Sequence, residues 1–523
     1  MRLPRIGHST RRVAAILAII VLCAGPASAH VGNPDVYFQG VAGPYHLIVT
    51  VRTPQMIPGI ADVEILSATP GISKITVVPT YIVGPGAKYP PVGDLLTQSK
   101  DDPQYFSGKI WLMESGSWQI LVQVEGAQGA GALALPVPAA ARRTLPMEKS
   151  LGVLLFTLMA LLVLSIIAIV GAARREGTLE PGQMPSADQA RRGRRVMMGA
   201  AVVVFALLFF GNWWWNSEAF AKARQMIYKA PPLNVSLEPG GKLILHMGDS
   251  EWHRTRPETV MTNLIPDHGY LMHLFLIREP GLDRFYHLHP RLQSGLNLAG
   301  AHTFELALPA IPAGRYEVFA DVVRESGFPD TMTAEIDLPD VPGVPLAGDN
   351  SEATAPPLAG AADSTTAIPG GAASAADGLT SVLPDGYRMV WERGSAPLVV
   401  NHFVWLRFRV ETPDGKPVMD MEPYMGMAGH AEIVRSDRSV FAHIHPDGSV
   451  AMAALELAQK NAPVQAASST MDAGMKMNMR MDPPSAEVSF PYGFPKAGEY
   501  RIFVQVKRGG QIETGVFDTK VIP

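Results

Sequence analysis

Two stretches of this 523-residue chain share one pattern, Phe-Tyr-His-Leu-His-Pro at residues 285–290 and Phe-Ala-His-Ile-His-Pro at residues 441–446. A further histidine precedes each stretch, His273 in the first case and His430 in the second. Because the same elements occur twice in the same order, we infer that the chain contains an internal duplication.

The duplicated segments continue into similar strands. A Gly-x-Tyr strand pattern follows each histidine pattern, at residues 314–316 and 498–500. Residues 30–140 show short β-branched runs separated by Pro and Gly, which are typical of a small β-sandwich, and contain a related strand at residues 116–122. We therefore predict three related sandwiches, of which the two at residues 232–340 and 379–523 carry the histidines. Between them, residues 341–378 consist mainly of Ala, Gly, Pro, Ser and Thr, a composition that predicts a flexible linker.

The spacing of the histidines predicts metal binding. Residues i and i+2 of a strand point to the same face, and the proline that follows each pair ends the strand near a loop. A hairpin would bring the upstream histidine alongside, and imidazole suits copper, zinc, nickel and iron. The alternative is that the histidines only cap a sheet end by hydrogen bonding. The predicted sites are His273, His287 and His289 in the first repeat and His430, His443 and His445 in the second.

The methionines favour copper among these metals. Residues 471–481 contain five methionines separated by polar residues and small residues, which is neither a helical stripe nor a strand core. Thioether sulfur is a soft ligand that selects Cu(I) over hard cations, although a flexible filler segment is the alternative interpretation. The candidate sulfur ligands are Met425, Met427, Met475, Met477, Met479 and Met481.

The N-terminus has the pattern of a secretory signal. Residues 1–29 contain a basic region, a short apolar core and an Ala-Ser-Ala cleavage site. The mature chain would then begin at His30, whose α-amine and imidazole offer two nitrogen ligands. His46 is the only other histidine in the predicted N-terminal β-sandwich at residues 30–145, so both are candidate copper ligands. A chance histidine at position 30 is the alternative.

Two uncharged stretches are long enough to cross a bilayer. We predict transmembrane helices at residues 151–173 and 196–216, the second ending in three tryptophans suited to a membrane interface. The loop at residues 174–195 carries the densest arginine cluster and is predicted to be cytoplasmic. The sequence therefore predicts a bacterial inner-membrane protein whose other modules face the periplasm or the cell exterior.

Composition excludes several classes of function. The net charge is −4, which gives no electrostatic reason to bind nucleic acid. The single cysteine, Cys23, excludes a disulfide framework and a multi-thiolate metal site within one chain. The sequence has no Ser-His-Asp order with a nucleophile elbow, no phosphate-binding glycine loop before a helix and no His-Glu-x-x-His motif. We therefore expect a protein that is not an enzyme.

Parts of the chain resemble known bacterial domains. Residues 420–520 resemble a recurring exported domain often found beside copper-handling proteins. Residues 30–140, with the membrane anchor, resemble the YtkA, FixH and CopC group of immunoglobulin-like periplasmic domains, but they lack a clear CopC-like set of acidic and histidine ligands beyond His30 and His46. The resemblance implies copper binding or delivery. The expected fold is mainly β, with three immunoglobulin-like β-sandwich modules and a two-helix transmembrane hairpin.

These observations leave three hypotheses of function. The first is a membrane-anchored periplasmic copper-binding protein, a chaperone or resistance factor, whose partners are the lipid bilayer and a periplasmic protein that donates or receives copper. The second is a non-catalytic accessory for respiratory oxidase assembly, with structural histidines. The third, a copper enzyme built on His30, needs more nearby ligands than His46 alone supplies.

Overall fold

A computed structural model of the chain describes residues 30–31, 35–256, 261, 263–293, 302–358, 378–462 and 485–523. These residues are mainly β and form several sheets, which confirms the predicted class. The chain divides into two compact units, one comprising Met1–Ala139 with Ala230–Pro523 and the other Ala140–Lys229. The predicted signal sequence and the methionine-rich segment 471–481 lie outside the described residues.

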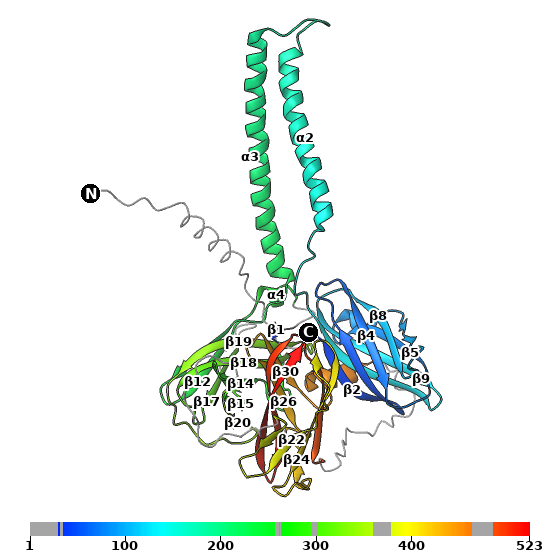
Figure 1. Cartoon of the computed structure of the whole chain (residues 1–523), viewed down its shortest axis with the longest axis vertical. Coiled ribbons are helices and arrows are strands. Elements are labelled where there is room, and N and C mark those ends of the chain that lie inside the picture. The colour runs from blue at the N-terminus through cyan, green and yellow to red at the C-terminus, as the bar shows by residue number, and fades with distance from the viewer. Residues whose placement is uncertain are drawn as a thin grey trace, which may run out of the picture. The chain divides into compact units, whose positions relative to one another are not determined.

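The smaller unit contains two long helices, α2 (Lys149–Glu176) and α3 (Ala187–Met226), which lie side by side (Figure 1). Both are long and apolar enough to cross a membrane. Both extend beyond the predicted spans into the predicted loop, where Ser186 and Gln189 form a capping box that starts α3. Gly171 permits a close approach, since a Cβ there would lie 2.0 Å from Cγ of Met197.

The N-terminal module contains two sheets. Their strand orders are β2-β3-β4-β8-β7 and β10-β9-β5-β6. The buried residues alternate along β3 and β4, as expected for strands with one face in a core. The elements are β2 (Val36–Ala42), β3 (Tyr45–Arg52), β4 (Gly59–Ser67), β5 (Ile72–Tyr81), the 3-10 helix η1 (Pro85–Lys88), β6 (Asp94–Leu95), β7 (Thr97–Gln98), β8 (Tyr105–Leu112), β9 (Gly116–Gly126) and β10 (Gly129–Ala139).

The first repeat also contains two sheets, which contribute to one hydrophobic core. Their orders are β11-β12-β17-β16 and β13-β18-β14-β15-β20, with β19 beside β18. The elements are β11 (Leu233–Glu238), β12 (Lys242–Met247), α4 (Glu251–Arg254), β13 (Leu264–Ile265), β14 (His273–Arg278), β15 (Arg284–Leu288), β16 (Arg291–Leu292), β17 (His302–Ala307), β18 (Gly314–Arg324), β19 (Pro329–Leu338) and β20 (Ser351–Thr354).

The prediction of a flexible linker over residues 341–378 was wrong for its first part. Strand β20 pairs antiparallel with β15, and Ala353, Ala355 and Leu358 are buried in a hydrophobic cluster. Small apolar residues serve there as packing residues against neighbouring strands, which composition alone did not reveal. Residues 359–377 lie outside the described part of the chain.

The second repeat has the same kind of architecture. One sheet has the order β21-β22-β24-β28 and the other β1-β27-β26-β29-β30-β23, with β25 beside β29, and both contribute to one core. The elements are β1 (His30–Val31), β21 (Thr380–Val382), β22 (Arg388–Trp391), β23 (Leu398–Val399), β24 (Phe403–Glu411), β25 (Met421–Glu422), β26 (His430–Arg435), β27 (Val440–Ile444), α5 (Met452–Asn461), β28 (Glu487–Gly493), β29 (Gly498–Arg508) and β30 (Gln511–Ile522).

The two repeats share a three-strand arrangement. Strand β14 lies between β15 and β18, and its counterpart β26 lies between β27 and β29. Corresponding aromatic residues then pack crosswise between the repeats. Phe285 of β15 stacks on Phe503 of β29, with ring centroids 4.2 Å apart, and Phe319 of β18 stacks on Phe441 of β27 at 4.1 Å. The repeats therefore face each other in an approximately twofold manner.

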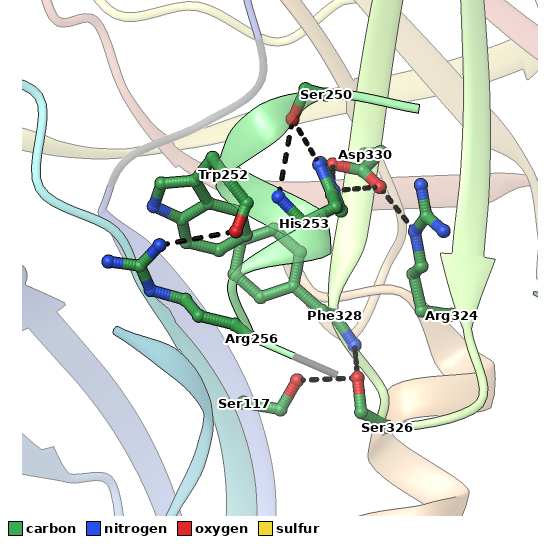
Figure 2. A network of polar contacts seen from close by, with 9 residues as sticks. All are labelled: Ser117, Ser250, Trp252, His253, Arg256, Arg324, Ser326, Phe328 and Asp330. Carbon is green, nitrogen blue, oxygen red and sulfur yellow. Dashed lines mark hydrogen bonds and ion pairs between the residues drawn. The ribbon is translucent and has the colours of Figure 1, made fainter. Parts of the chain in front are cut away.

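A buried polar network stabilises one end of the first repeat (Figure 2). Asp330 accepts hydrogen bonds from Nε of Arg324 at 2.7 Å and from Nε2 of His253 at 2.9 Å. Ser250 lies 2.6 Å from Nδ1 of His253 through its Oγ, which also caps α4 by accepting from the backbone N–H of His253. Ser326 of the same region contacts Ser117 of the N-terminal module. The network therefore fixes α4 against β18 and β19.

Replacing Asp330 with Ala is expected to destabilise the larger unit by about 3–5 kcal/mol, because the change leaves the buried Arg324 guanidinium without its carboxylate partner. Burial alone would raise the pKa of Asp330, but the hydrogen bonds and charges of His253 and Arg324 lower it, so the carboxylate is ionised at neutral pH. Urea denaturation of the full-length protein measures the effect. The control is Asp62→Ala, which breaks an exposed ion pair with Lys109. A control loss as large as that of Asp330→Ala would contradict the interpretation.

Candidate metal centre

Seven histidines gather where the two repeats meet. Four come from strands or turns of the first repeat and three from the second, and neighbouring imidazole centroids lie 4.7–6.4 Å apart. Five of the seven are buried, and the side chain of His443 is only 6% exposed. The members are His268, His273, His287, His289, His430, His443 and His445, and together they are called the histidine cluster below.

The structure brings together the three histidines predicted for the first repeat. His273 begins β14, His287 lies in β15 and His289 directly follows that strand. Their potential ligand atoms all lie within 4.8 Å of one another. This first group therefore has a geometry compatible with metal binding.

Hydrogen bonds in the first group orient one nitrogen of each ring toward the other rings. Nε2 of His273 donates to the carbonyl of Asp267 at 3.1 Å, and Nδ1 of His287 donates to Oε1 of Gln505 at 2.9 Å. Nδ1 of His289 donates to Oδ1 of Asn350 at 3.0 Å. In the neutral rings the opposite nitrogens then carry lone pairs. Two of these, Nδ1 of His273 and Nε2 of His287, face each other at 3.1 Å, and Nε2 of His289 is buried without a hydrogen-bond partner.

The second group differs from the prediction in one member. His268, His430 and His445 have their potential ligand atoms within 4.8 Å of one another, so His268 of the first repeat takes the place expected for His443. Nδ1 of His268 donates to the carbonyl of Met425 at 3.0 Å and Nδ1 of His445 donates to the carbonyl of Val450 at 3.1 Å. Their Nε2 lone pairs face each other at 3.3 Å. Both ring nitrogens of His430 are buried, and neither has a hydrogen-bond partner within the described ranges.

The spacing of histidines within one repeat could not assign His268 to the second group, because His268 belongs to the first repeat and contacts histidines of the second. It occupies a left-handed turn with φ of 50°, and the matching turn of the second repeat has Met425 at φ of 49°. Each turn is closed by a β-bridge between its first and fourth residues, Asp267 with Tyr270 and Tyr424 with Met427. Alignment of the two turns would have drawn attention to His268 and Met425 as corresponding residues.

His443 lies between the two groups. Its imidazole centroid is 5.4 Å from that of His273, 5.5 Å from that of His430 and 4.7 Å from that of His445. Its Nδ1 lies 3.5 Å from Oδ2 of Asp321, and its Nε2 is buried without a hydrogen-bond partner. The structure therefore brings His443 close to His430 and His445, as predicted, and also close to the first group.

A carboxylate that the sequence analysis missed lies beside the cluster. Glu432 is fully buried, and neither of its carboxylate oxygens has a hydrogen-bond partner in the part of the chain that the structure describes. Its Oε1 lies 3.8 Å from Nδ1 of His287, and its backbone pairs with that of His443. Because Glu432 follows His430 by two residues on β26, the two-residue strand period could have identified it.

Burial keeps the histidines in the form that binds metals. Desolvation, followed by the charges of neighbouring histidines, lowers the pKa of His273 to about 3. Burial likewise lowers the pKa of His289 to about 4 and that of His443 to about 3. The pKa values of His287, His430 and His445 are lowered well below the ordinary value for the same reason. The six rings are therefore neutral at physiological pH, as metal coordination requires.

The other predicted ligands have different placements. Met425 contacts the cluster through its backbone carbonyl, and Met427 is buried and forms backbone hydrogen bonds with Tyr424. His46 is exposed on β3, whereas His30 lies in β1 beside Val440, so the two belong to different sheets. The remaining predicted ligands, Met475, Met477, Met479 and Met481, lie outside the described residues.

An open pocket of about 760 Å³ reaches the first group. Tyr270 and His289 contribute to its wall, together with Arg291 and Asn350. The Tyr270 ring stacks on His289 with centroids 3.9 Å apart, and its hydroxyl donates to Asp349. The pocket therefore provides a solvent route to the edge of the histidine cluster.

Residues 380–522 match a family described as "Domain of unknown function (DUF8832)". No curated protein matches the chain significantly. Similar solved structures include dimeric latent PorU from Porphyromonas gingivalis, with 8% identity over 94% of this chain and 34% of PorU, and a TM-score of 0.15. A tetra-tandem repeat of a large adhesion protein has 9% identity over 91% of this chain and 74% of its own, with a TM-score of 0.15. The chain thus spans about a third of PorU, and similarities this low carry no argument.

Proposed function

We propose that this protein is a membrane-anchored metal-binding protein that holds copper in the histidine cluster. The observation that supports it most strongly is the two pairs of facing imidazole nitrogens, 3.1 and 3.3 Å apart. Two nitrogens bound to one tetrahedral metal ion at about 2.0–2.1 Å would lie roughly 3.3–3.4 Å apart. Each of the four rings in these pairs donates a hydrogen bond from its other nitrogen to an oxygen, an arrangement that orients metal-bound histidines.

Copper is the metal that the whole chain favours. Imidazole also suits zinc, nickel and iron, but the methionine-rich segment adds soft ligands that select Cu(I). The buried cluster would hold the ion away from solvent, and the pocket beside Tyr270 would give it a route in and out. These features support storage or transfer of copper to or from a partner protein rather than catalysis.

The proposed location is the periplasmic face of a bacterial inner membrane. The two apolar helices, the signal-like N-terminus and the arginines between the helices support it. The paired sheets support the further proposal that each module is an immunoglobulin-like sandwich related to the YtkA, FixH and CopC group.

The proposed function predicts that copper binding depends on the cluster histidines. Full-length protein in detergent should bind Cu(I), and the variant His287→Phe with His445→Phe should lose at least 100-fold in affinity, because it removes one facing nitrogen from each pair. A competition assay against a chromophoric chelator measures this. His46→Phe, which changes an exposed histidine elsewhere, should bind as the wild type does. Absence of copper binding by the wild type, or preference for zinc over copper, would overturn the proposal.

The methionine-rich segment predicts additional soft ligands for Cu(I). Thioethers stay neutral at every pH, and burial keeps the cluster histidines neutral at pH 5, because their pKa values are lowered, to about 3 for His273 and about 4 for His289. Replacing Met475, Met477, Met479 and Met481 with Leu should therefore weaken Cu(I) binding both at pH 5 and at pH 7.5. Equal affinities of the wild type and this variant at both pH values would show that the segment has no role in copper binding.

A further inference from the structure

We propose that the two histidine groups bind two copper ions as one binuclear centre, with His443 between the groups and the Glu432 carboxylate beside them. This inference rests on the proposed metal-binding function and deepens it. It makes the metal a link between the two repeats rather than a ligand of each repeat separately.

The first argument is that the groups are in contact. The imidazole centroid of His443 lies within 5.5 Å of ring centroids in both groups. These are the rings of His273 in the first group and of His430 and His445 in the second. The buried Nε2 of His443 has no hydrogen-bond partner among the described residues, so this nitrogen is available to a metal ion at either group. An ion bound at one group therefore lies close enough to the other to change its affinity.

The second argument is that ligands cross between the repeats. His268 belongs to the first repeat but groups with two histidines of the second. In the opposite direction, Gln505 of the second repeat accepts from His287 of the first, and Asp321 of the first repeat faces His443 of the second. The second group therefore takes a histidine from the first repeat, and in the first group His287 is oriented by a residue of the second repeat.

The third argument concerns the buried oxygens of Glu432. Among the described residues its two carboxylate oxygens have no hydrogen-bond partner, and Oε1 lies 3.8 Å from Nδ1 of His287. A buried carboxyl group without hydrogen bonds is costly unless a cation contacts it. The first repeat has Phe275 at the corresponding position, two residues after the histidine that begins the strand, so the strand arrangement does not itself require a carboxylate. A Cu(I) ion bound beside Glu432 would supply the missing contact.

The test is the number of Cu(I) ions bound by the full-length protein, and their affinities, under anaerobic reducing conditions. The wild type should bind two ions per chain. Glu432→Gln, which keeps the side-chain volume and removes the charge, should weaken the second ion 10- to 100-fold while the first still binds. Glu499→Gln, which changes an exposed carboxylate of the same repeat, should behave as the wild type does.

Glu432→Phe copies the residue of the first repeat and guards against a folding defect in the Gln variant. It should also weaken the second ion. His289→Phe, which disables the first group, should raise the affinity of the second group at least tenfold, because the positive charge of the neighbouring ion is then absent. Two ions that bind independently, one ion per chain, or Glu432 variants identical to the wild type would overturn the binuclear centre and leave copper binding intact. Absence of copper binding by the wild type would instead overturn the proposed function.

Discussion

The metal-free protein is expected to lose about 4 kcal/mol of folding free energy when the pH falls from 6 to 5. Six buried cluster histidines have pKa values lowered by burial, to about 3 for His273 and about 4 for His289. In this range the unfolded chain binds a proton at each of these histidines and the native chain does not. Their contribution to stability is thus complete above the ordinary pKa of 6.5 and is lost as the pH falls toward the native values.

Three carboxyl groups oppose this loss. Burial raises the pKa of Asp321 to about 6 and that of Glu432 well above its ordinary value, and burial with the charge of Glu279 raises that of Glu317 to about 7. Between pH 6 and pH 5 the native chain keeps these protons and the unfolded chain has largely lost them. The unfolded chain therefore binds about three more protons than the native chain, six at the histidines less three at the carboxyl groups. Each such proton changes the free energy of unfolding by about 1.4 kcal/mol per pH unit. The raised pKa values of Glu352, Asp447 and Glu513 act in the same direction as these three, whereas Asp330, Asp414 and Asp437, whose pKa values are lowered, are ionised in both states in this range.

Denaturant unfolding of the full-length protein at pH 7.5, 6 and 5 measures this dependence. The variant His287→Phe with His443→Phe removes two of the six histidines and should lower the slope by about 3 kcal/mol per pH unit. Copper should protect the wild type, because bound imidazole resists protonation. A flat wild-type profile between pH 6 and pH 5, or a slope that the variant does not change, would contradict the neutral buried cluster.

The second large effect is expected at the aromatic contacts between the repeats. Replacing both Phe285 and Phe441 with Ala should cost about 6–10 kcal/mol, since each truncation of a buried Phe costs about 3–5 kcal/mol. Both rings are buried, and each stacks on a Phe of the other repeat. Because His268 reaches the second group only across this interface, copper affinity should also fall at least tenfold.

A matched control separates the interface from general stability. Phe408 is buried in the core of the second repeat and stacks on Trp391 there. Phe408→Ala should lower the free energy of unfolding by about 3–5 kcal/mol and leave copper affinity unchanged in conditions where the protein remains folded. Copper binding that survives in the interface variant, or that falls equally in the control, would show that the cluster does not depend on the contact between repeats.

The sequence predicted the strand pattern better than the contacts between modules. The two-residue strand period placed His287 and His289 on one face, and the duplicated order identified both β14 and β26 as histidine-bearing strands. Periodicity describes one strand at a time, so it could not show that His268 crosses to the second repeat or that His443 lies between the groups. These placements depend on how the two repeats pack.

Composition was misleading where small residues have a packing role. Residues 351–354 lie in a stretch of small residues and prolines that resembles a linker, but they pair with β15, and Ala353 is buried. Helix lengths were underestimated for a related reason. The uncharged windows marked the apolar centres of α2 and α3, whereas the polar turns at their ends continue the same hydrogen-bonded helices.

The most direct test of the account is the ligand shell of copper in the full-length protein, measured by X-ray absorption at the copper edge at pH 7.5. We predict a nitrogen shell at about 2.0 Å with the outer-shell scattering of imidazole, and its loss in the His287→Phe, His445→Phe variant. A shell made only of sulfur would place the metal at methionines instead. That result, or an unchanged nitrogen shell in the variant, would contradict the claim that the histidine cluster between the repeats is the copper site.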